Sequence, residues 1–272
     1  MLSRPKLWQW PNVLSIDSAL IAVTWQWIFA ESANISLPVS AYCVLGLSVW
    51  LTYMADRLFD THQREIGELL SLRHQFAKSY APTLWRIWAA ALILSITLAF
   101  TGLTAGQLSR GILLLCVCLT YTFLNQFLSA RFFPKEVLVA LIFAAGAVVF
   151  IESPIPWGAF FCFAALCLLN CLSLGNKERA VDSALCVRSL SDYVSPRRLW
   201  AFIIIISIGV GIGILDSSSS LMWSLAVPLS LVSMLMRCRR QIATETYRVF
   251  VDAAMLGGIL PLLYTQALMA SF

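Results

Sequence analysis

The segment LTYMADRLFDTHQRE, residues 51–65, places two aspartates four positions apart at the end of a long apolar run. A second segment, LSLGNKERAVDSALCVRSL at residues 172–190, repeats the arrangement of an acid, an arginine, two further residues and an aspartate. Residues four apart share one helix face, so each segment presents two carboxylates together. Acids within or beside membrane helices are costly and usually functional. The candidate pairs are Asp56 with Asp60 and Glu178 with Asp182.

The composition around these acids is that of a membrane protein. Of the 272 residues, 60% are hydrophobic and 12% are charged, and the mean hydropathy is +0.81. A soluble domain carries about 25% charged residues, so a soluble globule is excluded. Because about 20 apolar residues cross the hydrocarbon core as a helix, we predict one all-α polytopic domain over residues 1–272. Nine transmembrane helices are expected, at 12–30, 38–57, 83–103, 108–129, 136–152, 157–176, 199–215, 220–236 and 249–269.

The basic residues predict the orientation of these spans. With nine spans, all of the 19 Lys and Arg residues except Arg110 fall on one side of the membrane, which the positive-inside rule places in the cytoplasm. The sequence "MLSRPKLWQWPN" leads directly into a span, so a bacterial inner membrane is the expected location. The charge is spread over loops and is not gathered on a soluble module, so no nucleic-acid partner is expected.

Four carboxylates that converge stay ionised only if cations lie between them. Oxygen ligands of this kind favour Mg²⁺, which shares its coordination with phosphate oxygens. Basic residues nearby would balance a polyanion beyond the metal, and in a membrane the natural diphosphate is an isoprenoid one. These basic residues are Arg64, Arg73, Lys135 and Arg188.

The two motifs resemble those of the UbiA superfamily of intramembrane prenyltransferases. That family has nine helices, with N-x-x-x-D-x-x-x-D ending the second and D-x-x-x-D ending the sixth. Here the first motif reads TYMADRLFD at residues 52–60 and the second reads ERAVD at residues 178–182. Thr52 replaces the family's Asn, Glu178 replaces an Asp, and Leu174 stands where some members carry Tyr. The likeness in topology and motif spacing extends over nearly the whole chain.

The resemblance implies Mg²⁺-dependent transfer of a prenyl group from an allylic isoprenyl diphosphate to an aromatic or lipid-head acceptor. It implies catalytic and metal-binding roles for Asp56, Asp60, Glu178 and Asp182. The family also tends to place a basic residue after helix 4, which Lys135 matches, and a basic residue and Ser/Thr after the second motif, which Arg188 and Ser189 match. The expected substrate-binding residues are Thr52, Arg64, Arg73, Lys135, Arg188, Asp17 and Asn125.

Several polar residues have two interpretations. Asp17 would either position an acceptor or serve as a bundle-facing acid with a polar partner. Asn125 and Asn170 are of a type that more commonly forms hydrogen bonds between helices. Asp252 is expected to pair with Arg248, four residues earlier. The RCRR run at 237–240 is interpreted as a topology determinant that touches anionic membrane lipid.

Other function classes remain as alternatives. A transporter would carry broken helices near the midplane, whereas these acids cluster at the cytoplasmic ends. A CDP-alcohol phosphotransferase would need D-G-x-x-A-R, and the chain contains no Asp-Gly pair. A non-catalytic protein that binds polyprenyl lipid is the third alternative.

Overall fold

A computed structural model describes residues 5–62, 65–66, 69, 71–128, 134–184, 189–217 and 220–271. For residues 125–128, 180–184, 217 and 269–270 the structure describes the backbone only. Every regular element in the described ranges is helical, which confirms the all-α class. In chain order the elements are η1 (Leu7–Gln9), α1 (Trp10–Val13), α2 (Ile16–Ser32), α3 (Val39–His62), α4 (Leu72–Ser79), α5 (Ala81–Gly102), α6 (Ala105–Leu128), α7 (Lys135–Val148), α8 (Trp157–Ala184), η3 (Leu190–Asp192), α9 (Pro196–Ser217), α10 (Ser220–Cys238), α11 (Thr244–Leu256) and α12 (Ile259–Ala270).

The chain is a multi-pass membrane protein, but the expected nine spans are not confirmed. In the described residues, seven helices are long and apolar enough to cross a membrane, or eight if one bent pair counts as a span. The seven are Val39–His62, Ala81–Gly102, Ala105–Leu124, Trp157–Arg179, Pro196–Asp216, Ser220–Cys238 and Thr244–Leu268.

The fifth expected span, 136–152, is shorter than the apolar run that predicted it. It forms α7, which has 14 residues and is therefore about 21 Å long, less than a hydrocarbon core of about 30 Å. Its alanines Ala140, Ala144 and Ala147 are buried in the same core cluster as residues of α2. Small residues allow helices to approach closely, so α7 lies within the bundle and its length is not set by the bilayer alone.

The first expected span is broken. Leu7–Val13 and Ile16–Ser32 meet at 76°, and Ser15 between them has a φ of 57°, in the left-handed region. Two side chains of α3 satisfy carbonyls at this break: Arg57 Nη1 donates to the carbonyl of Val13 at 2.7 Å, and Trp50 Nε1 donates to that of Leu14 at 2.8 Å. Backbone groups freed inside a membrane need such partners, so α3 stabilises the bend.

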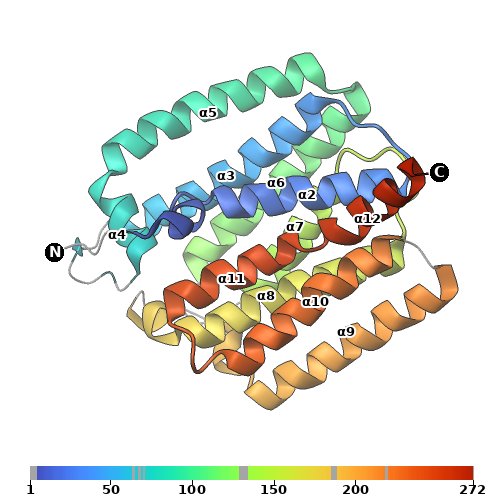
Figure 1. Ribbon diagram of the computed structural model, residues 1–272. Helices are drawn as coiled ribbons and strands as arrows, with labels where there is room; N and C mark the ends of the chain where they lie inside the picture. Colours follow the sequence, from blue (N-terminus) through green and yellow to red (C-terminus); the bar gives the residue numbers. More distant parts are fainter. Residues whose placement is uncertain are drawn as a thin grey trace.

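The core forms where α2, α8 and α11 meet. Trp25 on α2 is fully buried and stacks on Phe163 of α8, with ring centroids 4.1 Å apart. Its indole nitrogen donates to the carbonyl of Met255 on α11 at 3.0 Å. Figure 1 shows α5 and α9 at opposite edges of the bundle, with α2, α8 and α11 between them. Exposed apolar side chains such as Ile93 on α5 and Ile205 on α9 would face lipid there.

The junction between α11 and α12, at Gly257 and Gly258, generates a stability prediction. A Cβ added at Gly258 would lie 2.8 Å from Cζ2 of the immobile Trp25 and 2.9 Å from the carbonyl oxygen of Ser224. We expect Gly258→Ala to lower the free energy of unfolding by about 1–3 kcal/mol, the usual cost of overpacking. The measurement is unfolding of the purified protein in detergent.

Gly211→Ala is the matched control, because a Cβ there meets nothing within 4 Å. This exchange in the middle of α9 is expected to be neutral or to stabilise by about 0.5–1 kcal/mol. Equal destabilisation by both substitutions would contradict the packing assigned to Gly258.

Candidate functional site

The first acidic motif lies on a solvent-accessible side of α3. Thr52 and Asp56 are exposed, although Leu51, Met54 and Leu58 of the same helix are buried. Asp60, one turn beyond Asp56, is half-buried. Because the other sides of α3 are packed, the side that carries Thr52 and Asp56 is the one left available to a ligand.

Positive charges from three helices act on Asp56. They belong to Lys135 at the start of α7, Arg73 on α4 and Arg57 on α3 itself. Within the described part of the chain, the Asp56 carboxylate has no hydrogen bond or ion pair. It therefore has cations in its surroundings and oxygen atoms that remain free for a ligand.

Tyr121 extends this region to α6. Its phenol lies within electrostatic range of Asp56 and Asp60 on α3 and of Glu136 on α7. Thr52, which was expected to contribute an oxygen, donates its hydroxyl to the carbonyl of Ser48 in its own helix at 2.9 Å. Its oxygen still has lone pairs, so a ligand role for Thr52 stays a prediction.

The first acid of the second motif, Glu178 on α8, is buried among arginines. Arg73 Nη2 donates to its Oε2 at 3.1 Å, and Arg248 of α11 bonds to its Oε1. Arg248 is fully buried and also bonds through Nη1 to Glu245 Oε2 at 2.7 Å. The other Glu245 oxygen accepts from the backbone nitrogen of Leu72 at 3.2 Å, so this network joins α4, α8 and α11.

Arg73 connects the two motifs, because it acts on Asp56 and bonds to Glu178. Burial lowers the pKa of Arg73, but the Glu178 carboxylate and then Asp252 and Glu245 raise it by more, and the net shift is upward. Arg73 therefore stays positively charged. Residues 56 and 178, far apart in sequence, are brought to one end of the bundle by this side chain.

The four-carboxylate metal site stays a prediction. Among the described side chains, no group of three His, Cys, Asp or Glu residues could hold a metal ion. Asp182 lies in α8, but its side chain is outside the described residues. Oε2 of Glu178 accepts one bond, from Arg73, and keeps a lone pair, so metal coordination by Glu178 stays a prediction.

A second polar cluster surrounds Asp17 at the break between α1 and α2. The amide of Asn12 donates to Asp17 Oδ2 at 2.6 Å and to Asp252 Oδ2 at 3.0 Å. Asn170 of α8 donates to Asp252 Oδ1 at 3.2 Å, which agrees with an interhelical role for this amide. Asp252 was expected to pair with Arg248. The structure corrects this, because Arg248 is bonded to Glu178 and Glu245 instead.

The other residues predicted to bind substrate are only partly described by the structure. Arg64 and Arg188 lie outside the described residues, as does the side chain of Asn125. Lys135 is half-buried near Asp56. Ser189, which matched a family position after the second motif, bonds through Oγ to Glu136 Oε1 at 2.5 Å.

Sequence reasoning missed the roles of three polar residues. Arg248 was assigned to Asp252, Glu136 follows Lys135 and was passed over, and Asn12 is the first residue of the first expected span. The signal that could have identified Arg248 is a lone cation followed by a long apolar segment, since a charge there must find a partner inside the bundle.

The fold and the site together define an all-helical membrane protein that gathers carboxylates and cations at one end of its bundle. The apo structure of a UbiA homolog from Aeropyrum pernix K1 is similar to this chain, with a TM-score of 0.65 and 12% sequence identity. The match covers 91% of this chain and 98% of that one. No family model matches the sequence, and no curated protein sequence matches it. At this identity the likeness establishes the fold, so the expected UbiA-like architecture is confirmed at that level.

The buried arginine network generates a second prediction. Arg248→Gln would leave Glu178 without one partner in a buried environment, and we expect a loss of about 3–5 kcal/mol in the free energy of unfolding. Arg110→Gln is the matched control, because the Arg110–Glu152 pair is exposed and its loss is expected to cost at most about 1 kcal/mol. Unfolding in detergent distinguishes the two, and equal losses would contradict the assignment.

Proposed function

We propose that this chain is a divergent UbiA-type prenyltransferase, which transfers a prenyl group from an allylic isoprenyl diphosphate to an acceptor within the membrane. The observation that carries the proposal is the position of Arg73, which acts on Asp56 of the first motif and bonds to Glu178 of the second. The UbiA-like fold supports it, because it aligns over nearly the full length of both chains. The acceptor belongs to the class of aromatic rings or polar lipid heads.

The donor set fits a divalent cation at the first motif. Asp56 offers carboxylate oxygens without a direct partner among the described residues, and Asp60 is one turn away on the same helix. Mg²⁺ prefers such oxygens and retains sites for phosphate. The residues that would hold it are Asp56, Asp60, Glu178 and Asp182, and when bound it would neutralise charge on the leaving diphosphate.

The cations of the site would bind the diphosphate directly. Arg73 and Lys135 act on Asp56 from α4 and α7, so a diphosphate beside that carboxylate would lie within their reach. As the bond between the allylic carbon and the diphosphate oxygen breaks, negative charge grows on the diphosphate, and these cations stabilise it. Arg64 and Arg188 belong to the same proposal as further cations.

The acceptor completes the reaction. It attacks the allylic carbon, forms the new bond, and gives up a proton to restore its neutral state. The cluster of Asp17, Asn12 and Asp252 contains carboxylates that lack an arginine hydrogen bond in the described structure. We assign to Asp17 the role of positioning the acceptor or accepting this proton.

A non-catalytic polyprenyl-lipid-binding protein is the second candidate. One observation favours it: both oxygens of Glu178 bond to arginines, which would compete with a metal ion for this carboxylate. Release of diphosphate from an allylic donor separates the candidates, because a lipid-binding protein would retain the donor intact. A transporter is disfavoured, because the charged groups of this site gather at one end of the bundle.

Replacement of Asp56 tests the proposal. We expect Asp56→Asn to reduce diphosphate release from geranylgeranyl or farnesyl diphosphate by about 100-fold or more, the usual effect of removing one electrostatic contributor to a transition state. Asp182→Ala should have an effect of the same order. Unfolding in detergent should be unchanged for Asp56→Asn, since that carboxylate has no direct partner to lose.

Asp216→Asn is the control for this experiment. Asp216 is exposed near the end of α9, at the opposite end of that helix from Pro196, and its replacement should leave the rate unchanged. Turnover like that of the unmodified protein in Asp56→Asn would overturn the role of the first motif.

Metal removal gives an independent prediction. Treatment with EDTA is expected to abolish diphosphate release, and added Mg²⁺ should restore it, because the acids and a diphosphate repel one another without a cation between them. The assay uses the purified full-length protein with a panel of prenyl donors and candidate acceptors. Undiminished release in EDTA would rule out the metal-dependent reaction.

A further inference from the structure

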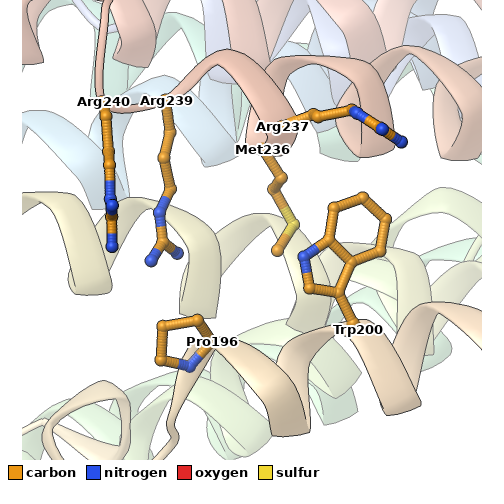
Figure 2. A pocket seen from close by; sticks show the side chains of 6 residues that line it. All are labelled: Pro196, Trp200, Met236, Arg237, Arg239 and Arg240. Atoms are coloured by element: carbon orange, nitrogen blue, oxygen red, sulfur yellow. The ribbon is translucent and has the colours of Figure 1, made fainter.

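Three arginines gather where α10 ends. Arg237, Arg239 and Arg240 line an open hollow of about 450 Å³, together with Met236 and with Pro196 and Trp200 of α9. Figure 2 shows Arg239 and Arg240 extending side by side toward the start of α9, while Trp200 lies beside Met236. The hollow therefore has a basic side and an apolar side.

These arginines lack the carboxylate partners that other arginines of the chain have. Arg73, Arg110, Arg179 and Arg248 each lie within 4.0 Å of an acid. In the described ranges no acid lies that close to any arginine of the hollow. Adjacent guanidinium groups repel one another unless an anion lies between them, and the guanidinium fork suits phosphate oxygens.

The end of α10 and the turn after it, which carry the arginines, are held in place. Lys177 Nζ on α8 donates to the carbonyl oxygen of Arg239 at 2.8 Å. Met236 is buried and packs in the main core. The arginines are thus presented from a fixed backbone, which reduces the entropy lost when an anion binds.

The hollow continues into a lipid-facing stripe. Trp200, Ile204, Ile208 and Ile212 are spaced four apart on one face of α9, and the three isoleucines are 58%, 57% and 61% exposed. Twelve residues of helix extend about 18 Å, roughly the depth of one leaflet's hydrocarbon. A soluble anion would gain nothing from this stripe, whereas an acyl chain would pack along it.

The position of the hollow in the membrane agrees with a headgroup site. The arginines belong to the side that the distribution of basic residues predicts to be cytoplasmic. Tryptophan is enriched at the level of the headgroups, where Trp200 would lie. Phosphate, glycerol and acyl chains of one molecule would then meet the arginines, the indole and the isoleucines in that order.

We propose that this hollow binds an anionic phospholipid of the cytoplasmic leaflet, with its phosphate at Arg239 and Arg240 and an acyl chain along the α9 stripe. The site shares no residue with the acid-rich site on α3, α4 and α8, and it stands independently of the proposed enzymatic function. The charge of the arginine cluster selects an anionic headgroup, and the stripe selects a lipid over a water-soluble phosphate.

The test is binding of dioleoyl-phosphatidylglycerol and dioleoyl-phosphatidylcholine to the full chain in detergent, followed by native mass spectrometry. We expect a clear preference for phosphatidylglycerol. Arg240→Gln should weaken phosphatidylglycerol binding about fivefold and Arg239→Gln/Arg240→Gln about 25-fold, with little change for phosphatidylcholine. Trp200→Ala should weaken binding of both lipids, because it removes the apolar wall.

Two matched controls make the result specific. Arg86→Gln replaces another exposed arginine on the same expected side, and Trp223→Ala replaces another exposed tryptophan on the far part of α10. Neither should change lipid binding, and the unfolding temperature in detergent should be the same for all variants. Equal loss in Arg86→Gln, or no preference for phosphatidylglycerol in the unmodified protein, would overturn the proposal.

A competition experiment distinguishes binding of a lipid from binding of a soluble anion. Inorganic phosphate or glycerol 3-phosphate in excess should leave phosphatidylglycerol bound, because neither can occupy the stripe. Displacement of the lipid by either compound would show a soluble-anion site and would also overturn the proposal.

Discussion

The buried carboxylate of Glu178 is the constraint on which the acid-rich end of the bundle depends. A charge removed from water in a membrane protein needs partners with good geometry, and here Arg73 and Arg248 supply them. Arg73 lies on α4, a short helix that does not span the membrane, and Arg248 lies on α11. Their bonds to Glu178 of α8 therefore hold α4 against two helices that pack in the core. Arg73 thereby comes close to Asp56, and the first motif acquires a cation that its own helix does not provide.

The bend at the start of the chain is tied to the same helix as the first motif. Trp50 and Arg57 of α3 donate to carbonyls at the break between α1 and α2. Arg57 follows Asp56 directly, yet its guanidinium reaches the backbone at the bend on the buried side of α3. The exposed side of α3 carries Thr52, Asp56 and Phe59, whereas Arg57 on the buried side stabilises the bend. Arg57 therefore lies inside the first motif without pairing directly with its aspartates in the described structure, because its side chain is used at the bend.

Local features of the sequence predict much of this fold, and pairings over long distances account for most of what they miss. Apolar runs are properties of consecutive residues, so the helices at 38–57 and 157–176 and the acids at their ends were predictable. The length of α7 and the bend at Ser15 depend on packing against other helices, and for that reason the count of nine spans was not confirmed. The bonds from Arg248 to Glu178 and from Asn12 to Asp252 join residues 70 and 240 positions apart. A single sequence carries no signal for such pairs, and an i,i−4 rule applied to Asp252 and Arg248 chose the wrong partner.

The charges of the described site explain why the proposed chemistry would need a metal even though arginine is abundant. Glu178 and Glu245 already engage Arg248, and Glu178 also engages Arg73, so these cations are largely compensated before any substrate binds. Lys135 faces Asp56, whose charge it offsets. A diphosphate next to Asp56 and Asp60 would add several negative charges where the described cations already act on carboxylates. The repulsion between the diphosphate and these carboxylates would oppose binding unless divalent ions entered with the substrate. The arginine network and the proposed metal requirement would then be linked: the more firmly Arg73 and Arg248 hold Glu178, the more the first motif would depend on an added cation.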